Sequence, residues 1–172
     1  MPYKDSYVAK IREKIGHDFT LVMPTVDMII ENAGKLMLVY NRDFDAWAFP
    51  GGYVEPELPW VENAVREAFE EAGVVIKPEA VKMIGSVSGP YYRAKYPNGD
   101  TTQLFTNVFW SNQLESEQAE IDESEIDGKR WVTPAEITQL QLTDFGAAVF
   151  EVYQKYQLTK EPQLLTRANR IN

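Results

Sequence analysis

The apolar residues of this chain fall into short runs separated by polar turns, which is typical of a protein built from strands and helices. Apolar runs at residues 26–30 and 36–40 flank the sequence Glu-Asn-Ala-Gly-Lys and predict a strand, a turn and a second strand. The sequence Tyr-Pro-Asn-Gly-Asp at residues 96–100 is a strong turn signal, so its flanks are expected to pair as a hairpin. Further extended segments are predicted at residues 74–76, 81–87, 104–110 and 128–132.

Helical spacing occurs in four segments. Apolar positions four residues apart predict a short helix over residues 3–14, and Pro59 and Gly73 are expected near the two ends of a second helix. The sequence Thr-Pro-Ala-Glu from Thr133 has the capping chemistry of a helix start, and a longer helix is predicted over residues 144–156. Strands and helices in this order predict an α/β fold with helices packed on both faces of a mixed sheet.

The chain shows neither an internal repeat nor a low-complexity linker. Its 172 residues are enough for one domain with a sizeable core, so residues 1–172 are expected to form a single domain. Residues 1–16 are interpreted as an N-terminal helical extension, and residues 158–172 as a polar C-terminal tail that is loosely ordered.

The second predicted helix carries three carboxylates on one side. At about 100° per residue, Glu67, Glu70 and Glu71 share an arc of roughly 100° with Asn63. The opposite side is apolar and is expected to face a core through Val61, Ala64, Val65, Ala68, Phe69 and Ala72. Like charges at this spacing repel, and only Arg66 is adjacent to offset them. A bound divalent cation would relieve the repulsion, whereas the alternative is an ordinary solvated surface.

The segment before this helix favours the cation. An apolar stretch at residues 47–50 ends in Gly51 and Gly52, which permit unusual backbone angles and close approach of another group. A strand, a tight glycine loop and an acidic helix in succession would place loop carbonyls beside the carboxylates. Such a site consists only of oxygens and suits magnesium or manganese better than zinc.

At these residues the chain resembles the Nudix hydrolase family, whose signature is G-x5-E-x7-R-E-U-x-E-E-x-G-U, with U aliphatic. The matching positions are Gly52, Arg66, Glu67, Glu70, Glu71, Gly73 and Val74. Ala68 is a small departure at the first U position, and Leu58 replaces the first glutamate of the signature, with Glu57 one residue early. The resemblance implies a Nudix-type α/β/α sandwich with a mixed β-sheet. The missing acid is expected to affect the geometry of the loop more than metal binding.

The resemblance also implies roles for individual residues. The expected ligands of Mg²⁺ or Mn²⁺ are the Gly51 carbonyl and the carboxylates of Glu67, Glu70 and Glu71. Glu67 would hold a second cation or take the proton from a water, and Arg66 would orient the glutamates and the loop. A further catalytic carboxylate is expected from Glu125, at the end of an acidic stretch over residues 115–125 that is otherwise a solvated loop.

The implied substrate is a nucleoside diphosphate linked to another moiety. ADP-ribose or a nucleotide sugar is favoured, and dinucleoside polyphosphates and nucleoside triphosphates are the alternatives. Tyr91, Tyr92 and Arg93 precede the predicted hairpin turn and could stack on a nucleobase, although ordinary packing is the competing interpretation. The replacement at Leu58 leaves a second class open, a Nudix-shaped module that binds a nucleotide without cleaving it.

The composition of the chain limits the kinds of binding partner and chemistry that can be expected. The net charge of −9 and the scattered basic residues argue against nucleic acid, and no apolar run approaches the length of a membrane span. The chain has no cysteine, and His17 is its single histidine, so thiol, zinc–cysteine and histidine-based chemistry are disfavoured. We therefore expect a cytoplasmic enzyme acting on a small-molecule nucleotide. Many Nudix proteins pair, so the resemblance leaves a homodimer and a monomer as alternatives.

Overall fold

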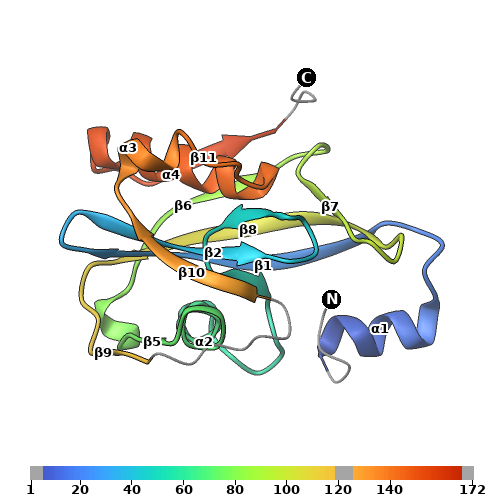
Figure 1. The fold of residues 1–172 in the computed structure, drawn as a ribbon. Helices are drawn as coiled ribbons and strands as arrows, with labels where there is room; N and C mark the ends of the chain where they lie inside the picture. Colours follow the sequence, from blue (N-terminus) through green and yellow to red (C-terminus); the bar gives the residue numbers. More distant parts are fainter. Residues whose placement is uncertain (1–5, 119–125, 168–172) are drawn as a thin grey trace.

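The computed structural model describes residues 6–118 and 126–167, and in it helices cover both faces of a mixed β-sheet (Figure 1). The main strands run in the order β10, β2, β1, β8, β6 and β11. Their bounds, in chain order, are β1 Leu21–Asn32, β2 Lys35–Asn41, β6 Lys82–Ser88, β8 Thr101–Ser111, β10 Ile126–Val132 and β11 Gln163–Thr166. The α/β/α sandwich expected from the sequence is thereby confirmed.

Shorter strands attach to this sheet or lie beside it. Strand β4 (Gly51–Tyr53) pairs with β1, β3 (Ala46–Ala48) with β2, and β7 (Arg93–Lys95) with β8. Strands β5 (Val74–Val75) and β9 (Ser116–Glu117) form a separate ribbon, and η1 (Pro78–Ala80) is a single 3₁₀ turn. The antiparallel pairing of β7 with β8 confirms the hairpin expected around residues 96–100.

Strand β1 organises the core because both of its faces are buried along its second half. It runs parallel to β8 on one side and antiparallel to β2 and β4 on the other. Val26 and Met28 belong to the apolar cluster that includes the alanines of the acidic helix, whereas Ile29 belongs to the cluster beneath the long C-terminal helix. The alternation of a strand therefore divides β1 between two cores.

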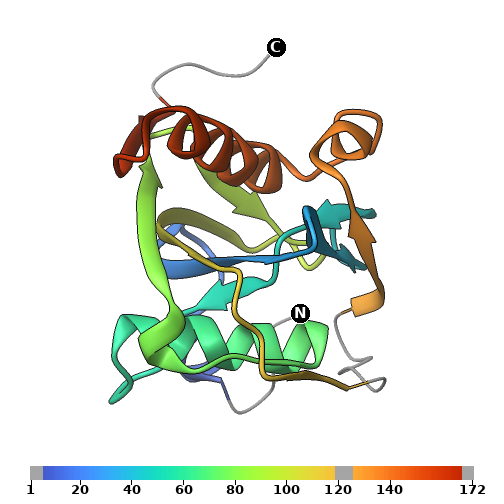
Figure 2. The same cartoon turned by 90° about the vertical axis from the view of Figure 1, so that its left-hand side faces the viewer.

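Two helical layers enclose the sheet. Helix α2 (Trp60–Ala72) lies on one side, and α3 (Pro134–Ile137) and α4 (Asp144–Thr159) lie on the other (Figures 1 and 2). Helix α2 begins after Pro59 and ends at Gly73, which adopts the left-handed conformation with φ 65°. Thr133 and Glu136 form the capping box expected at the start of α3. The described helices fall short of the length and apolar character needed to cross a membrane.

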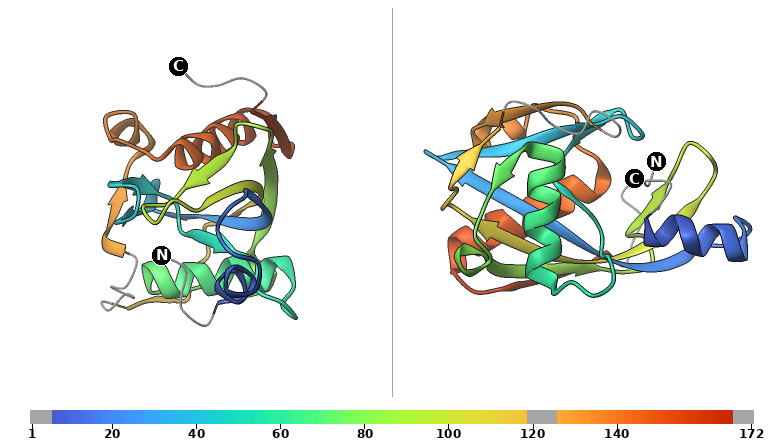
Figure 3. Two further views of the ribbon diagram at one scale, coloured as in Figure 1. Left: turned by 90° about the vertical axis from the view of Figure 1, so that its right-hand side faces the viewer. Right: turned by 90° about the horizontal axis from the view of Figure 1, so that it is seen from below.

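Helix α1 (Tyr7–Ile15) packs beside the end of the sheet, next to the hairpin of β7 and β8 (Figure 3). The buried Arg12 guanidinium attaches it there, donating to the carbonyl oxygens of Thr101 at 2.8 Å and Phe19 at 3.0 Å. It also lies 3.6 Å from the Asp100 carboxylate. The predicted N-terminal helix is confirmed.

Two expectations are wrong. The tail after residue 158 is not all loosely ordered, because α4 continues to Thr159 and β11 then pairs in parallel with β6. Leu165 packs against the core from β11, which gives this polar segment one apolar anchor. Phe69 does not face the core but is 45% exposed. Small alanines bring α2 close to the sheet, and this leaves the bulkier Phe69 outside the contact.

The docking of β11 depends on Gly85 in β6. A Cβ at this position would lie 2.3 Å from the Gln163 carbonyl oxygen and 2.8 Å from Val152 Cγ1. We expect Gly85→Ala to lower the free energy of unfolding by about 1–3 kcal/mol, because both β11 and α4 have to move. Urea denaturation measures this. Gly128→Ala is the matched control, since a Cβ there meets nothing within 4 Å and should change stability by less than about 0.5 kcal/mol. Equal stability of the two variants would contradict the docking.

Candidate active site

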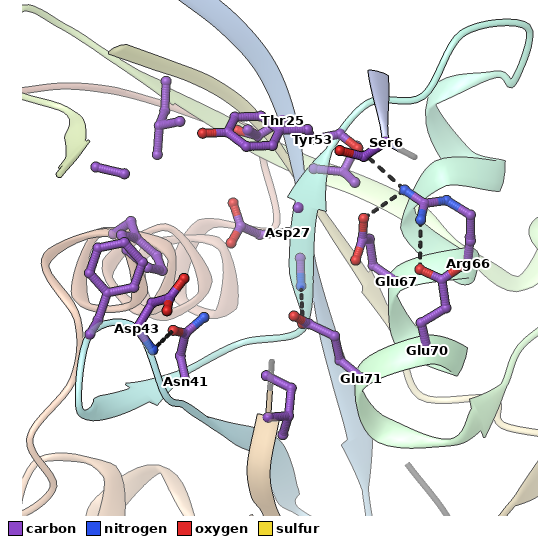
Figure 4. A pocket seen from close by; sticks show the side chains of 18 of the residues that line it. Ser6, Thr25, Asp27, Asn41, Asp43, Tyr53, Arg66, Glu67, Glu70 and Glu71 are labelled. Atoms are coloured by element: carbon purple, nitrogen blue, oxygen red, sulfur yellow. Dashed lines mark hydrogen bonds and ion pairs between the residues drawn. The ribbon is translucent and has the colours of Figure 1, made fainter. Parts of the chain in front are cut away.

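A pocket opens on both sides of β4 and encloses about 1060 Å³, counting the space open to solvent. Figure 4 shows Arg66, Glu67, Glu70 and Glu71 on one side of this strand and Asp27 on the other. The carboxylates at one end of the pocket come from α2. The opposite end is aromatic and is lined by Phe44, Tyr53, Tyr92, Tyr96 and Phe145. A single pocket thus joins a charged half to a half suited to a planar ring.

Two glycines let the acidic helix approach β4. A Cβ on Gly52 would lie 2.6 Å from Glu67 Oε1, so any larger residue would displace this carboxylate. The backbone N–H of Gly51 donates a hydrogen bond of 2.9 Å to Glu71 Oε2. A Cβ on Gly51 would lie 2.4 Å from the Val26 carbonyl oxygen. The glycine pair therefore places β4 between β1 and the carboxylates of α2.

Arg66 holds two of the three carboxylates. Its Nη1 donates to Glu70 Oε2 and its Nη2 to Glu67 Oε1, each at 2.6 Å, and Nη2 also donates to the Tyr53 carbonyl oxygen at 3.3 Å. Arg66 therefore offsets one of the three negative charges, as its place beside them in the sequence indicated. Three carboxylates and one guanidinium leave a net negative site.

The donor set fits a hard divalent cation in its chemistry, because every candidate ligand is an oxygen. Among residues 6–118 and 126–167, however, no three acidic, histidine or cysteine side chains already surround a common point. Glu67 and Glu71 are only 7% and 8% exposed, whereas the Glu70 side chain is 35% exposed and is held by Arg66. Binding of a cation by all three carboxylates consequently requires a rearrangement, and Glu70 has the most exposed side chain of the three.

Asn63 braces the loop in which the signature glutamate is missing. Its fully buried side chain accepts a hydrogen bond from the Glu55 N–H at 2.8 Å. It donates to the carbonyl oxygens of Leu58 at 3.1 Å and Pro59 at 3.2 Å. The Leu58 side chain itself is exposed. A neutral amide thus anchors the loop, and the only signal in the sequence was the place of Asn63 on the acidic side of the helix.

The predicted substrate residues separate in the structure. Tyr92 is 3% exposed and lines the pocket, whereas Tyr91 and Arg93 are exposed and are not among the pocket residues. Tyr91 lies in the turn that the Tyr92 N–H closes onto the Gly89 carbonyl, and Arg93 follows Tyr92 at the start of β7, where successive side chains face opposite ways. The substrate roles of Tyr91 and Arg93 stay predictions. Glu125 lies outside the described residues, and its role stays a prediction.

Asp27 is a pocket residue that the sequence reasoning missed. Its carboxylate is buried in β1 and accepts a hydrogen bond of 2.5 Å from Thr106 Oγ1. Burial raises the pKa of Asp27 to about 7, and the Thr106 hydrogen bond opposes the rise. An acid inside the apolar run at residues 26–30 was the available signal, since such a residue rarely lies in a core without a reason.

The layered sheet, the glycine loop and the acidic helix define a Nudix-type α/β fold. A family profile described as "NUDIX domain" matches residues 22–156, which is well over half of the chain. The chain therefore belongs to the Nudix family.

Individual relatives are more distant. A human protein named "Nucleoside diphosphate-linked moiety X motif 6" is 44% identical over 46 residues, which cover 26% of this chain and 15% of that protein. The match thus spans only a small part of that relative. The NUDIX domain of Shewanella oneidensis NrtR complexed with ADP ribose has 18% identity and a TM-score of 0.64, covering 90% of this chain and 99% of that one. An ADP-ribose pyrophosphatase from Streptococcus suis has 16% identity and a TM-score of 0.56, covering 84% and 98%. At these identities the two structures show a shared fold.

The bracing by Asn63 is testable through stability. We expect Asn63→Ala to lower the free energy of unfolding by about 2–3 kcal/mol, because the Glu55 N–H and two loop carbonyls lose a buried partner. Glu62→Ala, an exposed position one residue earlier on α2, is the control and should change it by less than about 0.5 kcal/mol. Chemical denaturation gives both values. Similar losses in the two variants would rule out a bracing role.

The raised pKa of Asp27 predicts a pH dependence of stability. The unfolded chain releases this proton near pH 3.8, whereas the folded protein keeps it to about pH 7. Between these values the folded state binds one more proton, so rising pH lowers stability by roughly 1.4 kcal/mol per unit. Asp27→Asn removes this slope. Urea unfolding from about pH 5 to 7 should show the variant gaining roughly 3 kcal/mol over the wild type, and parallel pH curves would contradict the assignment.

Proposed function

We propose that this chain is a divalent-cation-dependent Nudix pyrophosphohydrolase that cleaves the diphosphate linkage of a nucleoside diphosphate derivative. The observation that carries the proposal is the shared pocket, in which the carboxylates of α2 meet an aromatic half. The carboxylates suit a cation with its bound phosphates, and the aromatic half suits a nucleoside. The proposed cation is Mg²⁺ or Mn²⁺, because all of the candidate ligands are oxygens.

The proposed ligands are Glu67, Glu70, Glu71 and the Gly51 carbonyl. When bound, the cation lowers the pKa of water and offsets negative charge that develops on the phosphoryl oxygens. The Gly51 N–H fixes the orientation of Glu71, so this carboxylate is held in position before any ligand arrives. Arg66 holds Glu67 and Glu70 and limits the repulsion between them.

Proton transfer from the attacking water needs a carboxylate near the cation. Glu67 is our proposed acceptor, because it is buried against Gly52 and is held by Arg66. Burial of this kind keeps a catalytic group in one orientation. Glu125 is the alternative acceptor implied by the family resemblance.

ADP-ribose or a nucleotide sugar is the favoured substrate. Phe44 lies against Phe145 and Tyr96 with ring centroids 5.0 and 5.4 Å apart, and the three rings give the pocket an aromatic wall on which a base could stack. The two neighbours above are named for ADP-ribose, one as a bound ligand and one as the substrate of a pyrophosphatase. Dinucleoside polyphosphates and nucleoside triphosphates are the alternatives, and a homodimer stays a prediction.

Leu58 supports a second candidate, a module that binds a nucleotide without hydrolysis. The missing acid would then leave the glycine loop poorly ordered. Asn63 weakens this candidate, because it holds the same loop through three hydrogen bonds. The buried carboxylates of Glu67 and Glu71 also serve no evident purpose in a protein that only binds.

Hydrolysis is tested with a panel of nucleoside diphosphate derivatives in the presence of Mg²⁺ or Mn²⁺. We expect the wild type to release nucleotide and phosphorylated products, and Glu71→Gln to lose at least about tenfold in kcat/KM. The glutamine oxygen can still accept from the Gly51 N–H, so folding should be preserved. Glu62→Gln, an exposed carboxylate on the same helix, is the matched control and should keep full activity.

The two candidates give different results in this assay. A wild type that binds nucleotides across the panel and turns none of them over would favour the binding module. Activity that is unchanged in Glu71→Gln would contradict the proposed ligand set.

A further inference from the structure

Three polar side chains line the pocket on the side of the sheet that faces α4. Thr25 and Asp27 alternate on β1 with Val26, which packs toward α2, so both of them face the other way. Tyr92 joins them from the segment that precedes β7, where the Leu104 N–H donates to its carbonyl at 2.9 Å. None of these residues belongs to the Nudix signature.

The two hydroxyl groups are unusual for a protein interior. Thr25 is 6% exposed, Tyr92 is 3% exposed, and within the described ranges neither hydroxyl has a hydrogen-bond partner. Leaving a buried hydroxyl without a partner is costly, and such groups are rare in native structures. Both side chains line the pocket, so a ligand could supply the missing partner directly or through a bridging water.

Asp27 adds a carboxyl group to the same wall. Its Oδ2 accepts from Thr106, while its Oδ1 lies at the pocket side, 3.0 Å from where a Cβ on Gly51 would stand. Burial raises the pKa of the Tyr92 hydroxyl well above its usual value, and the negative charge of Asp27 adds to the rise. This wall of the pocket therefore offers a carboxyl oxygen and two hydroxyls.

We propose that Thr25, Asp27 and Tyr92 form the subsite that hydrogen-bonds the edge of the substrate nucleobase. The inference rests on the proposed function, since it takes the substrate to be a nucleoside derivative. The edge of a base presents N–H donors and ring-nitrogen or carbonyl acceptors in one plane. The Asp27 carboxyl and the two hydroxyls can accept from such donors, and the hydroxyls can also donate to such acceptors.

The surroundings favour the base over the ribose. Phe44, Tyr96 and Phe145 line the same half of the pocket, and aromatic rings of this kind stack on the face of a base. A base that does not match would leave these buried polar groups without hydrogen-bond partners, and water could not replace the lost bonds. Such a site therefore discriminates strongly between bases. The subsite would thus determine which base the enzyme accepts.

The test is equilibrium binding of AMP, GMP, CMP and UMP in magnesium buffer, measured by calorimetry. These ligands have no anhydride bond, so binding is read independently of hydrolysis. We expect the wild type to prefer one base by at least about tenfold. Tyr92→Phe and Asp27→Asn should each weaken binding of that base by about tenfold and reduce the preference.

Thermal unfolding of the ligand-free variants provides a second readout. Tyr92→Phe and Thr25→Val remove hydroxyls that have no partner in the described part of the chain, so their Tm should be equal to or higher than that of the wild type. Weaker binding together with undiminished stability identifies groups kept for a ligand. Tyr40→Phe is the control, because its hydroxyl donates to Asp45 at 2.7 Å and neither of these two residues lines the pocket. Its affinities should be unchanged.

The outcomes separate this subsite from the proposed function. Wild-type binding without base preference, no binding of any of the four nucleotides, or variants that keep the full preference would each overturn the subsite. So would equal affinity for all bases combined with weaker binding of the 2′-deoxy nucleotides, which would assign the wall to the ribose. Selective binding that the variants abolish, without turnover of any anhydride, would retain the subsite and reject the hydrolase proposal.

Discussion

Close packing of α2 against β4 determines both the position of the acidic side chains and the shape of the pocket. Gly52 leaves room for the Glu67 carboxylate, and the Gly51 N–H binds Glu71. On its other side α2 packs against the sheet through alanines, which permit a short distance between helix and strand. A helix with acids on one side and small residues on the other can therefore lie beside a glycine strand and still bury two of its carboxylates.

Burial of these acids has consequences for charge. The carboxylates of Glu67 and Glu71 lose most of their hydration, and Glu67 is compensated by Arg66 and Glu71 by the Gly51 N–H. The compensation of charge is incomplete, because the single guanidinium group of Arg66 lies beside three carboxylates. The site is consequently stable enough to fold and retains a negative potential that attracts a divalent ion. Asn63 adds rigidity in the adjoining loop without adding another charge.

Local patterns predicted much of this arrangement from the sequence. The acids, the glycines and the capping residues act within a few positions of each other, and the helix ends at Gly73 as expected. The contacts that were missed connect distant segments. The parallel pairing of β1 with β8 joins residues about eighty positions apart, and it brings Thr106 to Asp27. Strand β11 forms only because β6 offers an edge for it, which the polar composition of the tail does not reveal.

We infer that the carboxylates of α2 capture a divalent cation beside Gly51. Anomalous diffraction from crystals grown with Mn²⁺ tests it directly, because manganese is located without reference to catalysis. We predict an anomalous peak within bonding distance of Glu70, Glu71 and the Gly51 carbonyl, with Glu70 turned away from Arg66. A crystal that shows no manganese at this site, with Arg66 still bound to both Glu67 and Glu70, would contradict the claim.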